Sequence, residues 1–184
     1  KKMISYTFDS VLKSKFIKNC YCFTDDKRIN KIIKNKKIDI SIKRPEKISG
    51  DKTSSEETIL YLLKILKKSK KLSKNFILLQ PTSPLRTSKL IDLSIKYFFK
   101  KKFTSLLSLK RIKKNIFNIK SKKVFLNKNE TFISDGAIYI CNTKYFLKHK
   151  KFISSKIGYV ELPEKSTIDV DTTDDLNKVL KVLH

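Results

Sequence analysis

The sequence predicts a single α/β domain over residues 1–184, with a mainly parallel sheet flanked by helices. Segments with apolar residues at helical spacing alternate with short strand-like segments, which is typical of α/β folds. Residues 76–79 (Phe-Ile-Leu-Leu) form a continuous apolar run, as expected for a central parallel strand covered on both faces. The 184 residues are enough for one sizeable core, and no internal repeat or domain linker divides them.

The N-terminal half is predicted to alternate between helices and strands. Apolar residues at helical spacing indicate the helices, whereas short apolar clusters or strict alternation indicate the strands. In chain order we expect a helix from about Met3 to Phe16, a strand over 20–23, a short helix over 29–33, a strand over 38–42, and a helix that starts near Ser54–Glu57 and runs to Leu66.

The C-terminal half begins with the apolar strand 76–79. After it we expect a helix capped by Thr87 or Ser88, strands over 104–109, 137–140 and 160–162, and a final helix over 174–183. Residues 110–129 are rich in Lys and Asn and only weakly patterned. We therefore expect a shortened arm or hairpin over 110–134.

The net charge of +26 raises nucleic acid or an anionic membrane as a partner. Almost all the basic residues are lysines, and they are spread along the chain instead of gathered on one predicted face. Ala137 is the sole alanine, and Ile, Asn, Lys and Phe are abundant throughout, as an AT-rich genome would produce. We interpret the charge as a solvated surface and expect no specific nucleic-acid partner, with a polyanion partner as the alternative.

The sequence also indicates a location. No stretch reaches the roughly 20 apolar residues of a membrane span, and residues 1–6 lack the apolar core of a signal peptide. Cys20, Cys22 and Cys141 are odd in number and lack zinc-site spacing, which favours reduced thiols. We therefore expect a cytoplasmic protein without membrane insertion.

The segment Gln80-Pro81-Thr82-Ser83-Pro84-Leu85-Arg86-Thr87 follows the apolar strand and is a first candidate for function. Ligands of open α/β sheets bind at the carboxyl ends of strands. The amide of Gln80 lies at such an end and can pair with a base or a sugar. A rigid β–α turn whose polar groups cap its own helix explains the same residues, so both interpretations stay open.

Two aspartates alternate with apolar residues in Ile168-Asp169-Val170-Asp171-Thr172. On an extended segment, residues two apart face the same side, so both carboxylates would converge. Two hard oxygen ligands side by side are what Mg²⁺ needs alongside substrate phosphates. The alternative is a helix N-terminus capped by Asp171 or Thr172, and the two roles are compatible.

Two further polar segments are candidates. Gly136 in Ser134-Asp135-Gly136-Ala137 is one of only three glycines, which indicates a backbone close to a ligand or an unusual φ. Arg44-Pro45 is followed by a polar loop with Asp51-Lys52-Thr53-Ser54-Ser55 that opens a helix, and helix N-termini attract anions. An ordinary loop explains each segment at least as well.

Five segments, taken in order, resemble the cytidylyltransferases that activate nine-carbon sugar acids of the sialic or legionaminic type. They are TDD at 24–26, RP at 44–45, LLQPTSPLRT at 78–87, DGAIYI at 135–140 and IDVDTTDDL at 168–176. The decapeptide around Gln80 is the most specific match. The resemblance implies a Rossmann-like fold of the nucleotide-diphospho-sugar transferase type, and the conversion of CTP and a sugar acid to a CMP-sugar and pyrophosphate. The resemblance is also compatible with a homodimer.

The resemblance also assigns roles to the residues that match the family's motifs. It implies a base and ribose pocket, a sugar-acid pocket, and a Mg²⁺ ion as cofactor. The implied nucleotide-binding residues are Arg44, Thr53 and Ser55; the substrate-binding residues are Gln80 and Gly136; the metal ligands are Asp169 and Asp171; the catalytic residues are Asp169, Asp171 and Gln80.

Two departures from the family modify this expectation. Family members open with a strand and a phosphate loop of Gly, Ser, Arg and Lys before the helix that begins here at about Met3, and the chain shows neither. The stretch 105–135 is shorter than in the family, and Ile133 stands where an arginine is expected. We therefore expect weak CTP binding and little turnover from these 184 residues. The alternatives are a cytidylyltransferase for an eight-carbon sugar acid and a catalytically inactive nucleotide-binding remnant.

Overall fold

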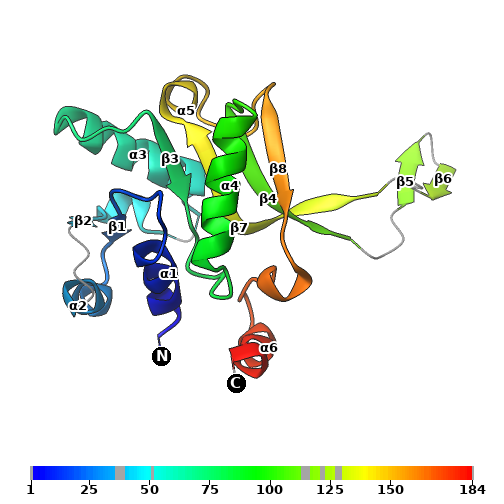
Figure 1. Ribbon diagram of the computed structural model, residues 1–184, viewed down its shortest axis with the longest axis horizontal. Helices are drawn as coiled ribbons and strands as arrows, with labels where there is room; N and C mark the ends of the chain where they lie inside the picture. The colour runs from blue at the N-terminus through cyan, green and yellow to red at the C-terminus, as the bar shows by residue number, and fades with distance from the viewer. Residues whose placement is uncertain are drawn as a thin grey trace.

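The computed structural model describes residues 2–35, 40–50, 52–112, 117–120, 123–126 and 130–183. The elements are α1 (Met3–Leu12), β1 (Tyr21–Thr24), α2 (Lys27–Asn35), β2 (Ile40–Lys43), the 3₁₀ turn η1 (Glu46–Ile48), α3 (Ser55–Lys68), β3 (Asn75–Leu78), α4 (Ser88–Lys100), β4 (Ser105–Arg111), β5 (Phe117–Lys120), β6 (Lys123–Leu126), β7 (Phe132–Asn142), α5 (Thr143–His149), β8 (Ile157–Glu161), the 3₁₀ turn η2 (Glu164–Ser166) and α6 (Thr173–Leu183). Helices and strands alternate as predicted up to α4, after which the strands β4 to β7 follow one another (Figure 1).

The two longest helices begin at the caps that the sequence indicates. Ser54 accepts a hydrogen bond from the Glu57 backbone N–H at 3.1 Å, and the Glu57 carboxylate accepts one from the Ser54 N–H at 3.0 Å. This reciprocal capping box fixes the start of α3. Thr87 caps α4 through the Leu90 N–H at 3.3 Å. The first turn of each helix is therefore set by local sequence.

Three helices end in a lysine with positive φ. Lys70 follows α3 with φ 56°, Lys102 follows α4 with φ 53°, and Lys150 follows α5 with φ 56°. Glycine usually fills this left-handed position because a Cβ is strained there. After α4, the N–H of Phe103 donates to the Phe98 carbonyl at 3.1 Å, which closes a Schellman motif.

The central sheet has the strand order β3-β7-β4-β8, and β1 pairs with β2 in a separate parallel ribbon. Strand β7 is antiparallel to both β3 and β4, whereas β8 is parallel to β4. Three of the four strands thus run in one direction, as in the predicted, mainly parallel sheet. Strand β3, however, was expected to be a central parallel strand, and within the described residues it lies at the edge of this sheet and pairs only with the antiparallel β7. The reversed β7 was not predicted. It follows from the chain path, because the β5–β6 hairpin returns the chain beside β4 in the opposite direction.

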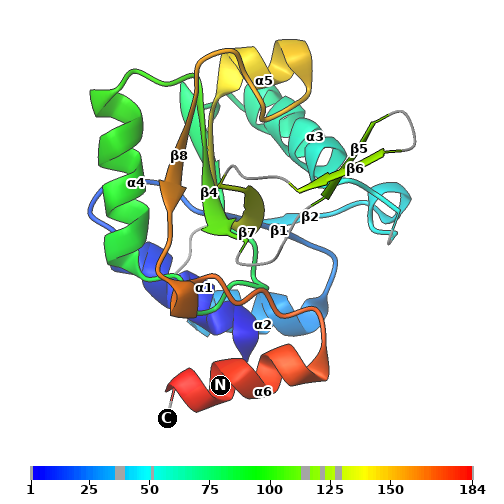
Figure 2. The ribbon, with the colours of Figure 1, turned by 90° about the vertical axis from the view of Figure 1, so that its right-hand side faces the viewer.

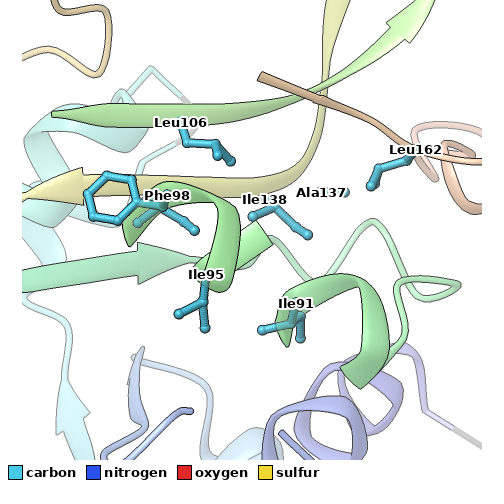
Figure 3. Packing of buried hydrophobic residues seen from close by; sticks show 8 residues of the cluster. Ile91, Ile95, Phe98, Leu106, Ala137, Ile138 and Leu162 are labelled. Carbon is cyan, nitrogen blue, oxygen red and sulfur yellow. The ribbon is translucent and has the colours of Figure 1, made fainter. Parts of the chain in front are cut away.

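Helices cover both faces of the central sheet, with α4 on one side and α3 and α5 on the other (Figure 2). Figure 3 shows Ile91, Ile95 and Phe98 of α4 packed against Leu106 and Ile138 of the sheet. The opposite face packs against α3 and α5 through a second apolar cluster. The buried residues shared among these layers form the predicted core. No helix in the part of the chain that the structure describes is long and apolar enough to cross a bilayer.

A cavity of about 560 Å³ separates the β1–β2 ribbon from the central sheet. Both β1 and β3 line it. In the described part of the chain, β1 pairs only with β2, and β3 pairs only with β7. Apolar side chains of α1 and α3 line the cavity as well. The sheet is therefore interrupted between β1 and β3.

The predicted arm over 110–134 falls partly outside the described residues. Within it, β5 and β6 pair as an antiparallel hairpin that lies away from the body of the domain, beyond the ends of β4 and β7 (Figure 1). Strand β4 extends into this region to Arg111, and β7 begins at Phe132. Nothing is described for 113–116, 121–122 and 127–129.

One predicted helix end needs correction, one predicted strand is described only in part, and one helix was missed. The first helix ends at Leu12 rather than Phe16, because Asp92 of α4 accepts hydrogen bonds from the Ser14 hydroxyl and the Lys15 N–H. Residues 38–39 of the predicted second strand lie outside the described residues, and β2 starts at Ile40. Helix α5 was not predicted at all, although Asn142 caps it by accepting from the Tyr145 N–H at 3.0 Å.

Candidate active site

Gln80, Gly136 and Asp169 come together at one end of the central sheet. Gln80 follows β3, Gly136 lies within β7, and Asp169 follows the turn η2. A Cβ built on Gly136 would lie 2.6 Å from Gln80 Oε1 and 3.3 Å from Asp169 Oδ2. Segments 56 and 33 residues apart in sequence therefore meet around one glycine.

Gly136 has the unusual φ that its rarity suggested, and it lies close to two side chains. Its φ of +76° is strained for any residue with a Cβ, and its buried α-carbon faces the Gln80 amide at close range. Only glycine lets the β7 backbone come this near to the two side chains. The groups that meet here are an amide, a carboxylate and main chain, all of which can bind a polar ligand.

The segment around Asp169 is docked onto the turn that follows β3. The Val170 N–H donates to the Thr82 carbonyl at 2.9 Å, and the Ser83 hydroxyl donates to Asp169 Oδ1 at 3.5 Å. Ser83 is fully buried, so its hydroxyl is fixed in place. The turn at 80–87 thus caps its own helix through Thr87 and also holds a distant segment.

Asp169 and Asp171 differ in their surroundings. Asp169 is half-buried, whereas Asp171 is exposed just before α6. Thr172, not Asp171, caps α6: its hydroxyl accepts from the Asp175 N–H at 3.2 Å. The carboxylate of Asp171 is therefore not needed to start the helix. Asp175 in turn binds the Thr172 hydroxyl at 2.7 Å, and hydrogen bonds from Lys178 and Thr172 lower the pKa of Asp175 to about 2.

Two carboxylates can contribute to a Mg²⁺ site but do not complete one. In proteins Mg²⁺ commonly takes one or two carboxylates and fills its other positions with water and substrate phosphates. Within the described ranges, no group of three or more His, Cys, Asp or Glu side chains could hold a metal. The donor chemistry of Asp169 and Asp171 fits Mg²⁺ whose remaining ligands come from a phosphate-bearing substrate.

Arg86 lies buried next to Gln80 and Ala137, with 1% of its surface exposed. Burial lowers the pKa of its guanidinium to about 10, against the opposing influence of Asp135 and Asp169. It therefore remains charged at neutral pH. Asp135 is also buried; its Oδ1 accepts from the Ser108 hydroxyl and from the Ala137 N–H at 3.0 Å. Sequence reasoning assigned no role to either residue, because burial and distant partners leave no local pattern.

The three predicted nucleotide-binding residues lie together on another loop, between β2 and α3. Arg44 donates to the Ser49 hydroxyl and carbonyl, each at 3.2 Å, and lies 3.4 Å from an Asp25 carboxylate oxygen. The Thr53 N–H donates to the Gly50 carbonyl at 3.0 Å, and Ser55 is exposed at the first position of α3. The recorded contacts of Arg44 thus run within its own loop and to the end of β1.

The cytidylyltransferase family model matches residues 1–181 of this chain. The chain belongs to the cytidylyltransferase family. Two relatives of this chain are named N-acylneuraminate cytidylyltransferase. The one from Streptococcus agalactiae serotype III is 26% identical over 197 residues, which cover 98% of this chain and 46% of the relative. The one from Escherichia coli O18:K1:H7 is 27% identical over 198 residues, with coverages of 99% and 46%. The chain thus spans about half the length of the curated relatives it matches.

Solved structures show that the fold is shared as well. A 4-diphosphocytidyl-2C-methyl-D-erythritol synthase from Anaerococcus prevotii superimposes with a TM-score of 0.76 at 16% identity, covering 100% of this chain and 87% of that one. A CMP:2-keto-3-deoxy-manno-octonic acid synthetase complexed with CTP gives a TM-score of 0.68 at 14% identity, with coverages of 100% and 88%. The predicted fold class is therefore confirmed.

Proposed function

We propose that this protein transfers the cytidylyl group of CTP to a nine-carbon sugar acid of the sialic or legionaminic type, with release of pyrophosphate. The observation that carries the proposal is the meeting of Gln80, Gly136 and Asp169 at one end of a cytidylyltransferase sheet. The N-acylneuraminate cytidylyltransferases that match nearly the whole chain support the nine-carbon class.

In the proposed reaction, the anomeric hydroxyl of the sugar acid attacks the α-phosphate of CTP. Gln80 can orient the acceptor, because its amide offers both donors and an acceptor to sugar hydroxyls. The backbone at Gly136 carries no side chain and lies directly against the Gln80 amide. Positioning of the hydroxyl against the phosphate is the main contribution that these residues can make to the rate.

The carboxylates of Asp169 and Asp171 would hold Mg²⁺ through hard oxygen ligands. When bound, Mg²⁺ offsets the negative charge that grows on the phosphate oxygens during transfer. The hydrogen bond that Ser83 donates to Asp169 and the docking of Val170 onto Thr82 keep the first carboxylate in place. Exposed Asp171 remains free to turn toward a ligand.

The loop between β2 and α3 is the proposed cytidine site. Cytosine offers a carbonyl oxygen and a ring nitrogen as acceptors, and a guanidinium has more N–H donors than the two that Arg44 uses on Ser49. Thr53 and Ser55 add hydroxyls for the base and ribose. We further propose that the protein acts in the cytoplasm with CTP and a sugar acid as its partners. No nucleic-acid partner is proposed, and a homodimer stays open.

An eight-carbon acceptor is the alternative, favoured by the similarity to the CMP:2-keto-3-deoxy-manno-octonic acid synthetase structure. Pyrophosphate release from CTP, measured with a nine-carbon acid, an eight-carbon acid or no acid, separates the two. The assay should use residues 1–184 and also a version in which a strand and phosphate loop from a relative precede Lys1. In the version that carries the loop, release that depends on the nine-carbon acid is expected, and residues 1–184 alone should release little. Release only with the eight-carbon acid supports the alternative, and release with neither acid contradicts both.

A further inference from the structure

Arg86 connects the segments around the candidate site without belonging to the predicted site residues. One of its terminal nitrogens, Nη1, donates to the Gln80 carbonyl at 3.1 Å and to the Ala137 carbonyl at 2.7 Å. The other, Nη2, donates to the Thr7 hydroxyl at 3.0 Å. A single buried guanidinium thus joins the end of β3, the middle of β7 and helix α1.

The backbone of Arg86 is also held in place. The Arg86 carbonyl accepts a hydrogen bond from the Ser10 hydroxyl of α1 at 2.7 Å, and the next residue, Thr87, caps α4. Arg86 therefore leaves a rigid helix start and reaches back toward the sheet. Because the guanidinium is planar, its donors hold a fixed mutual geometry, which a lysine ammonium cannot reproduce.

The two carbonyls that Arg86 binds lie next to the point where the Gln80 amide approaches Gly136. The Gln80 carbonyl is on the same residue whose amide meets Gly136, and the Ala137 carbonyl is one residue beyond Gly136. Because one nitrogen binds both carbonyls, it sets the distance between the end of β3 and β7 at this point. A shift here would move the Gln80 amide relative to Gly136 and Asp169.

We propose that Arg86 is the positioning residue of this site: its guanidinium fixes the Gln80 amide against the Gly136 backbone and thereby places the sugar acid. The proposal rests on the proposed function for the identity of the acceptor, but its geometric part does not. The nearby carboxylates of Asp135 and Asp169 stabilise the charged form of the buried guanidinium. Arg86 itself contacts no substrate in this assignment.

The test compares Arg86→Lys with Thr7→Val. The first variant keeps a charge but loses the planar fork, whereas the second removes only the contact on the α1 side. In Arg86→Lys we expect kcat/KM for the sugar acid to fall by about 10²-fold, as misplacement of a reacting group by about 1 Å can cause, with a much smaller change in the KM for CTP. Thr7→Val should retain near-normal kcat/KM.

A double-mutant cycle with Gln80→Ala separates positioning from general support of the fold. If Arg86 acts through Gln80, the double variant should be no slower than Gln80→Ala alone, because the Gln80 amide is already gone. Losses that multiply would overturn the proposal. A lysine variant as active on the sugar acid as wild type would overturn it as well.

Amide hydrogen exchange provides a readout that needs no turnover. In Arg86→Lys, exchange at Gln80, Gly136 and Ala137 should accelerate more than in Thr7→Val, while the two variants change α1 alike. Equal acceleration in both variants would overturn the proposal. If wild type transfers no cytidylyl group, the proposed function fails and exchange alone decides on Arg86. If neither Arg86→Lys nor Arg86→Gln folds while Thr7→Val does, Arg86 is a general support of the fold and the proposal is wrong.

Discussion

Replacing Gly136 with alanine tests the close approach on which the site depends. An alanine at φ +76° carries strain of about 1–2 kcal/mol, and its Cβ would overlap Gln80 Oε1, 2.6 Å away. Gln80 can turn away at a rotamer cost of about 0.5–1.5 kcal/mol. Alanine also restricts the unfolded chain, which offsets about 0.5–1 kcal/mol. The net expectation is a loss of about 1–2 kcal/mol in the free energy of unfolding.

For a chain of this size, such a loss lowers Tm by roughly 2–8 °C, which a thermal melt can measure. The displaced amide should also reduce kcat/KM for the sugar acid toward the value of Gln80→Ala. In a Gln80→Ala background the overlap is gone, so Gly136→Ala should cost less stability there. Gly50→Ala is the matched control, because a Cβ at Gly50 meets no atom within 4 Å. Equal losses at Gly136 in both backgrounds, or unchanged kinetics, would refute the reasoning.

Two further substitutions probe the predicted site residues. Gln80→Ala is expected to impair use of the sugar acid more than CTP binding, since its amide lies against Gly136, the other proposed substrate-binding residue; calorimetric CTP affinity reduced to the same extent would place Gln80 at the nucleotide instead. Asp171→Asn is expected to weaken Mg²⁺-dependent CTP binding while Tm stays unchanged, because Thr172 caps α6. Titration of Mg²⁺ into the CTP complex checks this, and an unchanged Mg²⁺ dependence would rule out the proposed metal ligand.

Features that depend on neighbouring residues could be predicted from the sequence. The capping box at Ser54 and the cap at Thr87 are local, and the apolar run 76–79 needs only burial to form a strand. The strained φ of Gly136 was foreseeable because glycine is so rare in this chain. Motif order along the chain was also enough to bring Gln80 and Asp169 into one hypothesis.

Features that depend on tertiary contacts could not be predicted. The partners of Arg86 at Thr7 and Ala137 lie 79 and 51 residues away, and its side chain resembles any surface arginine until it is buried. The end of α1 is set by Asp92, which sequence periodicity cannot reveal. The direction of β7 depends on how the chain returns from the hairpin, and alternation is the same in either direction.

The lysines that end α3, α4 and α5 show where this protein could gain stability. Replacing Lys70, Lys102 or Lys150 with glycine relieves about 1–2 kcal/mol of left-handed strain. Glycine's greater freedom in the unfolded chain takes back about 0.5–1 kcal/mol, which leaves a gain of up to about 1 kcal/mol per position. A higher Tm for each variant is expected, and a lower one would contradict it. Because α4 begins at the turn after Gln80 and rises about 20 Å to Lys102, a change at that end is remote from the chemistry. A glycine-poor composition has thus left stability that a glycine at these helix ends can recover.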